Sequence, residues 1–198
     1  MQKIDTSSKR VGCWGGYGIE GSIRMAKDLM ENGKHLKAVG RHSEALGKYA
    51  EAAGATEHYD AERASRIHRA VAKGYEKIGE HAFAGVHFEK AAQTKTVAAI
   101  VRGAPKGEMA EISGLYLEAV QNFLVAAVKN PGQPNFVRIS STDLAQHAWV
   151  KAMEFSQDFE ATSERLKMVV SSICGVTISD ANFMHDLYGA FASLRGKP

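Results

Sequence analysis

The chain has 198 residues, of which 44% are hydrophobic and 24% are charged. This size and balance suit one globular domain and exclude wholesale disorder. The formal net charge of +3 is too small for a dedicated nucleic-acid-binding protein, and no stretch reaches the roughly 18 apolar residues that a membrane span needs.

Residues 1–18 are polar and rich in glycine and show no helical period, so we interpret them as an irregular arm. They lack the apolar stretch of a secretory signal. The two cysteines, Cys13 and Cys174, have neither a Cys-x-x-Cys spacing nor companion histidines at metal-ligand intervals. We therefore expect a cytoplasmic protein with reduced thiols and without a metal or cofactor.

Apolar residues recur every three or four positions through the first half of the chain, a period that predicts helices. The expected helices lie at about 19–31, from 36 to 53, from 60 to 78 and around 84–91. Gly33, Gly54 and Gly79 are interpreted as stop signals, and Asp60 as an N-cap.

The second half begins with the longest apolar stripe, at 108–130, which Pro131–Pro134 brings to an end. Phe136–Ile139 has the composition of a short strand, although no partner strand is evident, and Ser140–Asp143 resembles a helix N-cap. Further helical patterns cover about 144–172 and 181–195. The expected total is seven or eight helices.

One pattern occurs three times: an alanine, an aromatic residue four positions later, and a second alanine seven positions after the first. The copies are Ala45-Tyr49-Ala52, Ala84-Phe88-Ala91 and Ala119-Phe123-Ala126, with intervals of 39 and 35 residues between them. Small residues let antiparallel helices approach closely, while the aromatic ring fills the space against the next hairpin. The pattern therefore predicts stacked helical hairpins.

These residues, together with Tyr75, resemble the tetratricopeptide repeat over about 26–131. The intervals exceed the usual repeat of roughly 34 residues, and Gly103–Gly107 interrupts the segment expected to form the first helix of the third repeat unit. The resemblance implies an all-α fold, in which hairpins over 19–131 stack as a short solenoid and the helices of 142–198 pack on it as a cap. It also implies a protein–protein interaction module: an adaptor, an assembly subunit or a chaperone.

In such repeats the first helices line a concave groove, and here basic residues lie along them at helical spacing. They are Lys34, Lys37, Arg66, Arg69, Lys73 and Lys77. We predict that this partly basic groove binds an acidic segment or the C-terminal carboxylate of another protein, because arginine can hold a carboxylate through two hydrogen bonds. A solvated helix face is the alternative. A homo-oligomer stays open, and nucleic acid is not expected.

A different motif supports a competing interpretation. Gly16, Gly18 and Gly21 form a G-x-G-x-x-G sequence that opens a helix, and Arg41 follows about twenty residues later. This segment resembles the front of an NADP-dependent short-chain dehydrogenase, whose glycines admit the pyrophosphate and whose arginine holds the 2′-phosphate. An oxidoreductase of that kind is the alternative function. Against it, no apolar strand precedes the motif and the Tyr-x-x-x-Lys pair is absent.

Two further sets of side chains carry predictions. Near the C-terminus, one apolar stripe either completes the core or docks a partner; it consists of Phe183, Leu187, Phe191 and Leu194. Among the eight histidines, His81 and His87 are placed on a hairpin helix, where we expect a surface or groove position.

Overall fold

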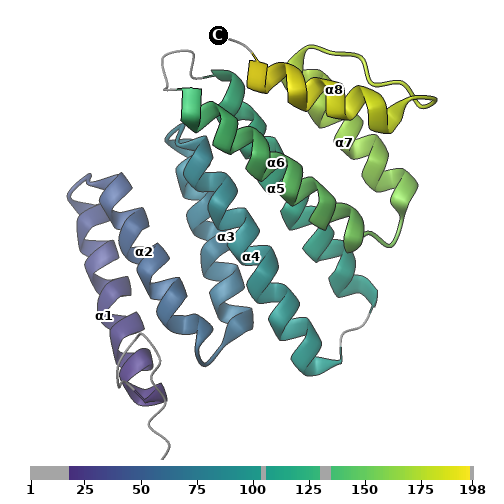
Figure 1. Ribbon diagram of the computed structural model, residues 1–198. Helices are drawn as coiled ribbons and strands as arrows, with labels where there is room; N and C mark the ends of the chain where they lie inside the picture. Colours follow the sequence, from purple (N-terminus) through teal and green to yellow (C-terminus); the bar gives the residue numbers. More distant parts are fainter. Residues whose placement is uncertain (1–17, 104–105, 130–134, 197–198) are drawn as a thin grey trace, which may run out of the picture.

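The computed structural model describes residues 18–103, 106–129 and 135–196, and over these ranges the chain forms eight α-helices and no strand. The helices are α1 (Ile19–Ala38), α2 (His42–Glu57), α3 (Ala61–Lys77), α4 (His81–Arg102), α5 (Lys106–Lys129), α6 (Asn135–Glu154), α7 (Phe159–Cys174) and α8 (Phe183–Gly196). From α1 to α6 each helix packs on the next, and α7 and α8 lie against α5 and α6 (Figure 1). The prediction of an all-α chain of sequentially packed helices is confirmed.

The α1–α2 and α3–α4 hairpins are closed by the same turn. Gly40 and Gly79 have φ angles of 81° and 82°, a region that glycine enters without steric cost. The N–H of Arg41 donates to the carbonyl of Leu36 at 2.9 Å, and the equivalent bond after Gly79 measures 3.0 Å. The residues of the two turns correspond at an offset of 39 residues, the interval between the first two alanine–aromatic–alanine copies.

Two predicted helix ends are wrong. α1 continues through Gly33 to Ala38, and α2 continues through Gly54 to Glu57. A glycine inside a helix costs about 1 kcal/mol relative to alanine, but Gly33 makes room for a ring. A Cβ atom at this position would lie 2.5 Å from Cε1 of Tyr49 in α2. Close helix packing, rather than a stop signal, therefore explains this glycine.

The predicted strand at Phe136–Ile139 is also wrong, because these residues belong to α6 and Ser140–Asp143 lie inside the same helix. A strand without a partner would leave its backbone groups unpaired, whereas a helix satisfies them internally. The long pattern at 144–172 divides into α6 and α7. Asp158 caps α7 by accepting a hydrogen bond from the N–H of Ala161 at 2.9 Å, and Asp60 caps α3 as predicted.

The third alanine–aromatic–alanine copy does not occupy the same place as the first two. The copies that begin at Ala45 and Ala84 lie in α2 and α4, the second helices of their hairpins, whereas the copy that begins at Ala119 lies in α5. The segment expected to form the first helix of the third repeat unit is the continuation of α4, which ends at Arg102 and is followed by Gly103, whose φ is 67°. All six alanines of the three copies are nevertheless buried.

The larger hydrophobic core lies among α3 to α8 and contains Phe88, Phe123 and Trp149. The apolar stripe of α8 belongs to it: Leu187, Phe191 and Leu194 are buried, and Phe183 packs against them. The stripe therefore completes the core and does not form an open docking surface. A second, smaller cluster lies between α2, α3 and α4; it contains Val71, Tyr75 and Ala84, with Leu46 and Tyr49 packed against them.

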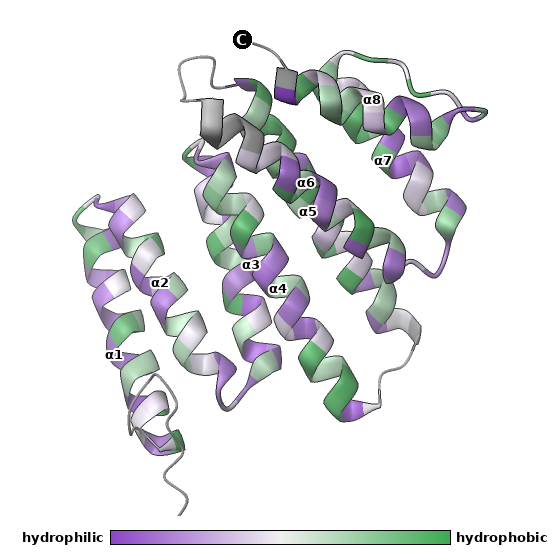
Figure 2. Cartoon of the chain, viewed as in Figure 1, coloured by the Kyte–Doolittle hydropathy of each residue, from purple (hydrophilic) through white to green (hydrophobic). Residues whose placement is uncertain are grey.

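One end of α4 presents apolar side chains to solvent. Val97, Ile100 and Val101 are 54%, 70% and 81% exposed, and this end of the helix is green in Figure 2. The three residues lie in the last two turns of the helix, beyond the part of α4 that carries Ala84, Phe88 and Ala91.

Candidate binding groove

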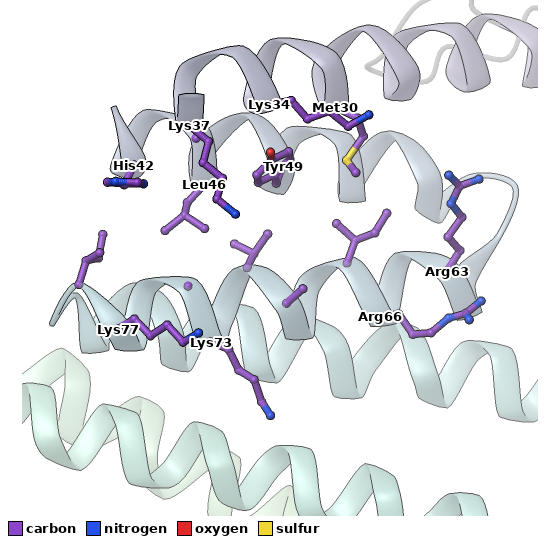
Figure 3. A pocket seen from close by; sticks show the side chains of 16 residues that line it. Met30, Lys34, Lys37, His42, Leu46, Tyr49, Arg63, Arg66, Lys73 and Lys77 are labelled. Atoms are coloured by element: carbon purple, nitrogen blue, oxygen red, sulfur yellow. The ribbon is translucent and has the colours of Figure 1, made fainter. Parts of the chain in front are cut away.

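A groove of about 940 Å³ lies between the α1–α2 hairpin and α3 (Figure 3). Each of the three helices contributes one face to it, because the lining positions recur every three or four residues. They are 30, 34 and 37 in α1, 42, 45, 46 and 49 in α2, and 63, 66, 67, 70, 71, 73, 74 and 77 in α3, with 78 directly after it.

The floor of the groove is apolar. Its residues are Met30, Ala45, Leu46, Tyr49, Ile67, Ala70, Val71, Gly74 and Ile78. Leu46 of α2 sits directly over Gly74 of α3, where any side chain would collide with it. This contact and the small cluster around Val71 join the two hairpins below the groove.

Six lysine and arginine side chains surround this floor, and none of the sixteen lining residues is acidic. The six are Lys34, Lys37, Arg63, Arg66, Lys73 and Lys77. Five of them were predicted from the sequence. Arg63 was missed, although its spacing of three residues from Arg66 and four turns of helix from Lys77 follows the same face.

The positive charge of the groove is poorly neutralised. Lys34 pairs with Glu31 at 2.7 Å on the exposed surface of α1, and its hydrogen bond to that carboxylate raises the pKa of Lys34. Within the described part of the chain, the other five cations form no ion pair with a carboxylate. An anionic ligand therefore has no internal competitor for these five side chains.

The cations are distributed unevenly along the groove. Lys37, Lys73 and Lys77 lie in the half of the groove that contains His42 and Leu46, and Arg63 and Arg66 lie at the other end (Figure 3). Lys34 lies between the two groups, beside Met30. The arrangement follows from the topology, because α1 and α3 run in the same direction, so that both end at the end of the groove where α2 begins (Figure 1).

Arg69, the sixth predicted residue, does not line the groove. Its guanidinium lies 3.5 Å from Glu111 of α5, within a group of ion pairs that joins α3, α4 and α5. At the centre of this group, the buried Lys95 contacts Glu62 at 2.9 Å and Glu111 at 3.2 Å. Burial lowers the pKa of Lys95, but its two carboxylate partners more than compensate and leave it raised. Arg69 therefore faces α5 and not the groove.

Two buried histidines, His68 of α3 and His87 of α4, face each other where these two helices pack. Nε2 of His68 is 2.8 Å from Oε1 of Glu57, and its Nδ1 is 3.2 Å from Nδ1 of His87. The ring of His87 stacks on Tyr75 with a centroid separation of 5.6 Å. Burial lowers the pKa of His87 to about 4, and the charges of His68 and Lys90 add to this effect. The surface or groove position predicted for His87 is wrong.

The glycine motif does not acquire the structure that a dehydrogenase needs. Gly16 lies outside the described residues, Gly18 precedes α1 and Gly21 lies in its first turns. Arg41 follows the other end of α1, about 30 Å away at 1.5 Å per residue, and pairs with Glu44 of α2. The parallel sheet on which a dinucleotide site is built is absent from residues 18–103, 106–129 and 135–196.

Comparison of the chain with known protein families, with curated proteins and with solved structures finds no match. Within the described ranges, no group of three or more histidine, cysteine, aspartate or glutamate side chains is placed to hold a metal ion. None of the described helices combines the length and the hydropathy required to cross a membrane.

Proposed function

We propose that this protein is a recognition module that binds an acidic segment of a partner protein in the groove between α1, α2 and α3. One observation supports this most directly: six cationic side chains surround an apolar floor, and no carboxylate lines the groove. Burial of apolar groups would supply most of the affinity, and the cations would supply selectivity and speed of association.

The shape of the α1–α4 region is consistent with tetratricopeptide-like hairpins in this role. The two hairpins share their turn geometry at an offset of 39 residues, and buried alanines occupy the same positions in α2 and α4. The groove lies on the faces of α1 and α3, the first helices of the two hairpins. Adaptors, assembly subunits and chaperones all use grooves of this kind.

The lining also favours a protein ligand over a nucleic acid. Single-stranded nucleic acids bind where aromatic rings stack on successive bases inside a basic channel. Tyr49 is the one aromatic residue among the sixteen that line the groove, and its ring packs on the backbone at Gly33. The floor instead offers aliphatic side chains, which suit the apolar side chains of a peptide.

The proposal is tested by charge reversal with a matched control. The double variant Lys37→Glu/Lys73→Glu changes two groove cations, and Lys27→Glu/Lys129→Glu makes the same change at two exposed lysines that do not line the groove. The probe is a fluorescein-labelled synthetic peptide of about 15 residues, with leucines in its centre and glutamates at both ends, and binding is followed by fluorescence anisotropy.

We expect the groove variant to bind the probe at least about tenfold more weakly than the wild type, because two attractions become repulsions. The control variant, which has the same net charge, should bind like the wild type. Equal losses in the two variants would show that the probe responds to net charge alone, and the groove would then not be the binding site.

A further inference from the structure

We infer that the partner segment occupies the groove as an amphipathic α-helix of about 15 residues, with acidic side chains near both of its ends, and not as an extended strand. This inference rests on the proposed function and specifies the conformation and charge pattern of the partner. Three features of the groove support it: its hydrogen-bonding groups, its length and the positions of its cations.

The hydrogen-bonding groups of the lining favour a ligand that satisfies its own backbone. An extended peptide lying on the apolar floor would bring both N–H and C=O groups out of water, and each unpaired group costs free energy. The lysines and arginines of the rim donate hydrogen bonds but accept none. Apart from the weakly accepting thioether of Met30, the hydroxyl of Tyr49 and the imidazole of His42 are the side-chain acceptors among the lining residues.

The groove walls do not replace these missing acceptors. They are the faces of α1, α2 and α3, whose backbone carbonyls are engaged within the helices except in the last turns, and asparagine and glutamine are absent from the lining. A helix bonds its own N–H groups to its own carbonyls and presents only side chains to the groove. A helical ligand thus avoids the penalty that an extended one would incur.

The dimensions of the groove agree with a helix of moderate length. Its lining runs along α3 from Arg63 to Ile78, which corresponds to about 22 Å at the helical rise of 1.5 Å per residue. A partner helix of about 15 residues covers the same length, with apolar residues every three or four positions facing Leu46, Ile67 and Val71.

The positions of the cations specify the charges of that helix. Arg66 and Lys73 are seven residues apart in α3, about two turns of helix. Acidic side chains on the partner should therefore lie on either side of an apolar stripe of about two turns. The denser acidic cluster should face Lys37, Lys73 and Lys77, since three of the six groove cations lie in that half of the groove.

The charge of the chain itself excludes one simple occupant. The segment 1–17 carries Lys3, Lys9 and Arg10 against a single carboxylate, Asp5. Its net positive charge would be repelled by the groove cations. A separate acidic partner complements the groove, and the N-terminal segment does not.

The test compares two peptides on the full chain. The first is the leucine-centred probe with glutamates at both ends. The second is the same peptide with a proline at its centre, which keeps the charges and nearly all of the apolar residues but cannot continue a helix. Both are titrated by anisotropy into the wild type and into Lys37→Glu/Lys73→Glu. A ¹³C-labelled copy of the first reports its bound conformation through its Cα chemical shifts.

We expect the proline peptide to bind about a hundredfold more weakly, the factor that corresponds to the penalty of proline inside a helix. The Cα shifts of the first peptide should become helical on binding. If the two peptides bind equally and both lose affinity in the double variant, the groove is the site but the ligand is extended, and the inference is overturned while the proposed function stands. If neither peptide binds the wild type, both proposals fail.

Discussion

The two halves of this molecule use the same element, a pair of antiparallel helices, but the hydrophobic core between neighbouring helices is small in one half and large in the other. α1 to α3 meet where Tyr49 and Leu46 pack on two glycines, Gly33 and Gly74, and a groove of about 940 Å³ remains between these helices. α4 to α8 meet through large rings such as Phe123 and Phe191, which are fully buried in one continuous core.

The comparison shows how one architecture supplies both a scaffold and a site. Large side chains between hairpins bury enough apolar surface to hold the layers together. Small side chains let paired helices approach closely, but they leave the outer faces of the helices free to line a groove. α3 belongs to both regions, because Ala72 lies in the larger core while Ile67 and Lys73 line the groove.

The largest expected effect comes from removing a ring of the larger core. Phe123→Ala should lower the free energy of unfolding by about 3–5 kcal/mol, since the side chain is fully buried. Tyr49→Ala, in the groove floor, should cost less than half of that because Tyr49 is only partly buried. Urea denaturation followed by circular dichroism measures both. Equal losses of unfolding free energy in the two variants would contradict the difference between the two halves. Phe159→Ala, which removes an exposed ring, serves as the control.

The next effect concerns the boundary between the halves, where His87 is buried against His68 and Tyr75. The pKa of His87 is about 4 in the folded protein and 6.5 in the unfolded chain, so the unfolded state binds a proton first as the pH falls. Stability is therefore full above pH 6.5 and declines down to about pH 4, by about 3 kcal/mol at 1.36 kcal/mol per pH unit.

Replacing His87 by glutamine should flatten the stability profile over this pH range, and His35→Gln, at an exposed position of α1, serves as the surface control. Denaturation midpoints between pH 4 and 7 measure the slope. A wild-type slope that persists in His87→Gln would assign the acid sensitivity to other groups, such as Glu57, whose pKa is lowered by its hydrogen bond from His68.

The smallest effect distinguishes Gly33 and Gly85, two helix glycines that each face an aromatic ring. A Cβ atom at Gly85 would lie 2.6 Å from Cδ1 of Phe123, which has no room to move in the core. Gly85→Ala should therefore cost about 1–2 kcal/mol, after the gain in helix propensity. At Gly33 the obstructing ring is Tyr49, which borders the groove and can shift into it. We expect Gly33→Ala to change stability by less than about 0.5 kcal/mol.

Thermal or urea unfolding of the two alanine variants, measured side by side, checks this difference. A Gly33→Ala variant as unstable as Gly85→Ala would mean that the groove floor is packed as rigidly as the core.

The sequence was sufficient for the all-α class, for the cap at Asp60 and for five of the six groove cations, because each depends on local spacing. It was not sufficient where the role of a residue depends on a contact with a residue far away in the sequence. Gly33 has the composition of a helix end, and only the position of Tyr49 shows why a glycine is needed inside α1. Arg69 shares the spacing of the groove residues, yet it forms an ion pair with Glu111 of α5, which lies 42 positions away in the sequence.

The length of α4 has a consequence for how the molecule opens. This helix packs on α3 and on α5. It contributes Ala84 to the smaller cluster, and Phe88, Ala91, Ala92 and Ala99 to the larger core. α3 to α8 are therefore expected to exchange their amide hydrogens with solvent as one slow unit, whereas α1 and α2 form a separate, faster unit joined through α2. The α3 wall of the groove should therefore open only when the whole protein unfolds. The opposite wall, formed by α1 and α2, can open in a local fluctuation while α3 to α8 stay folded.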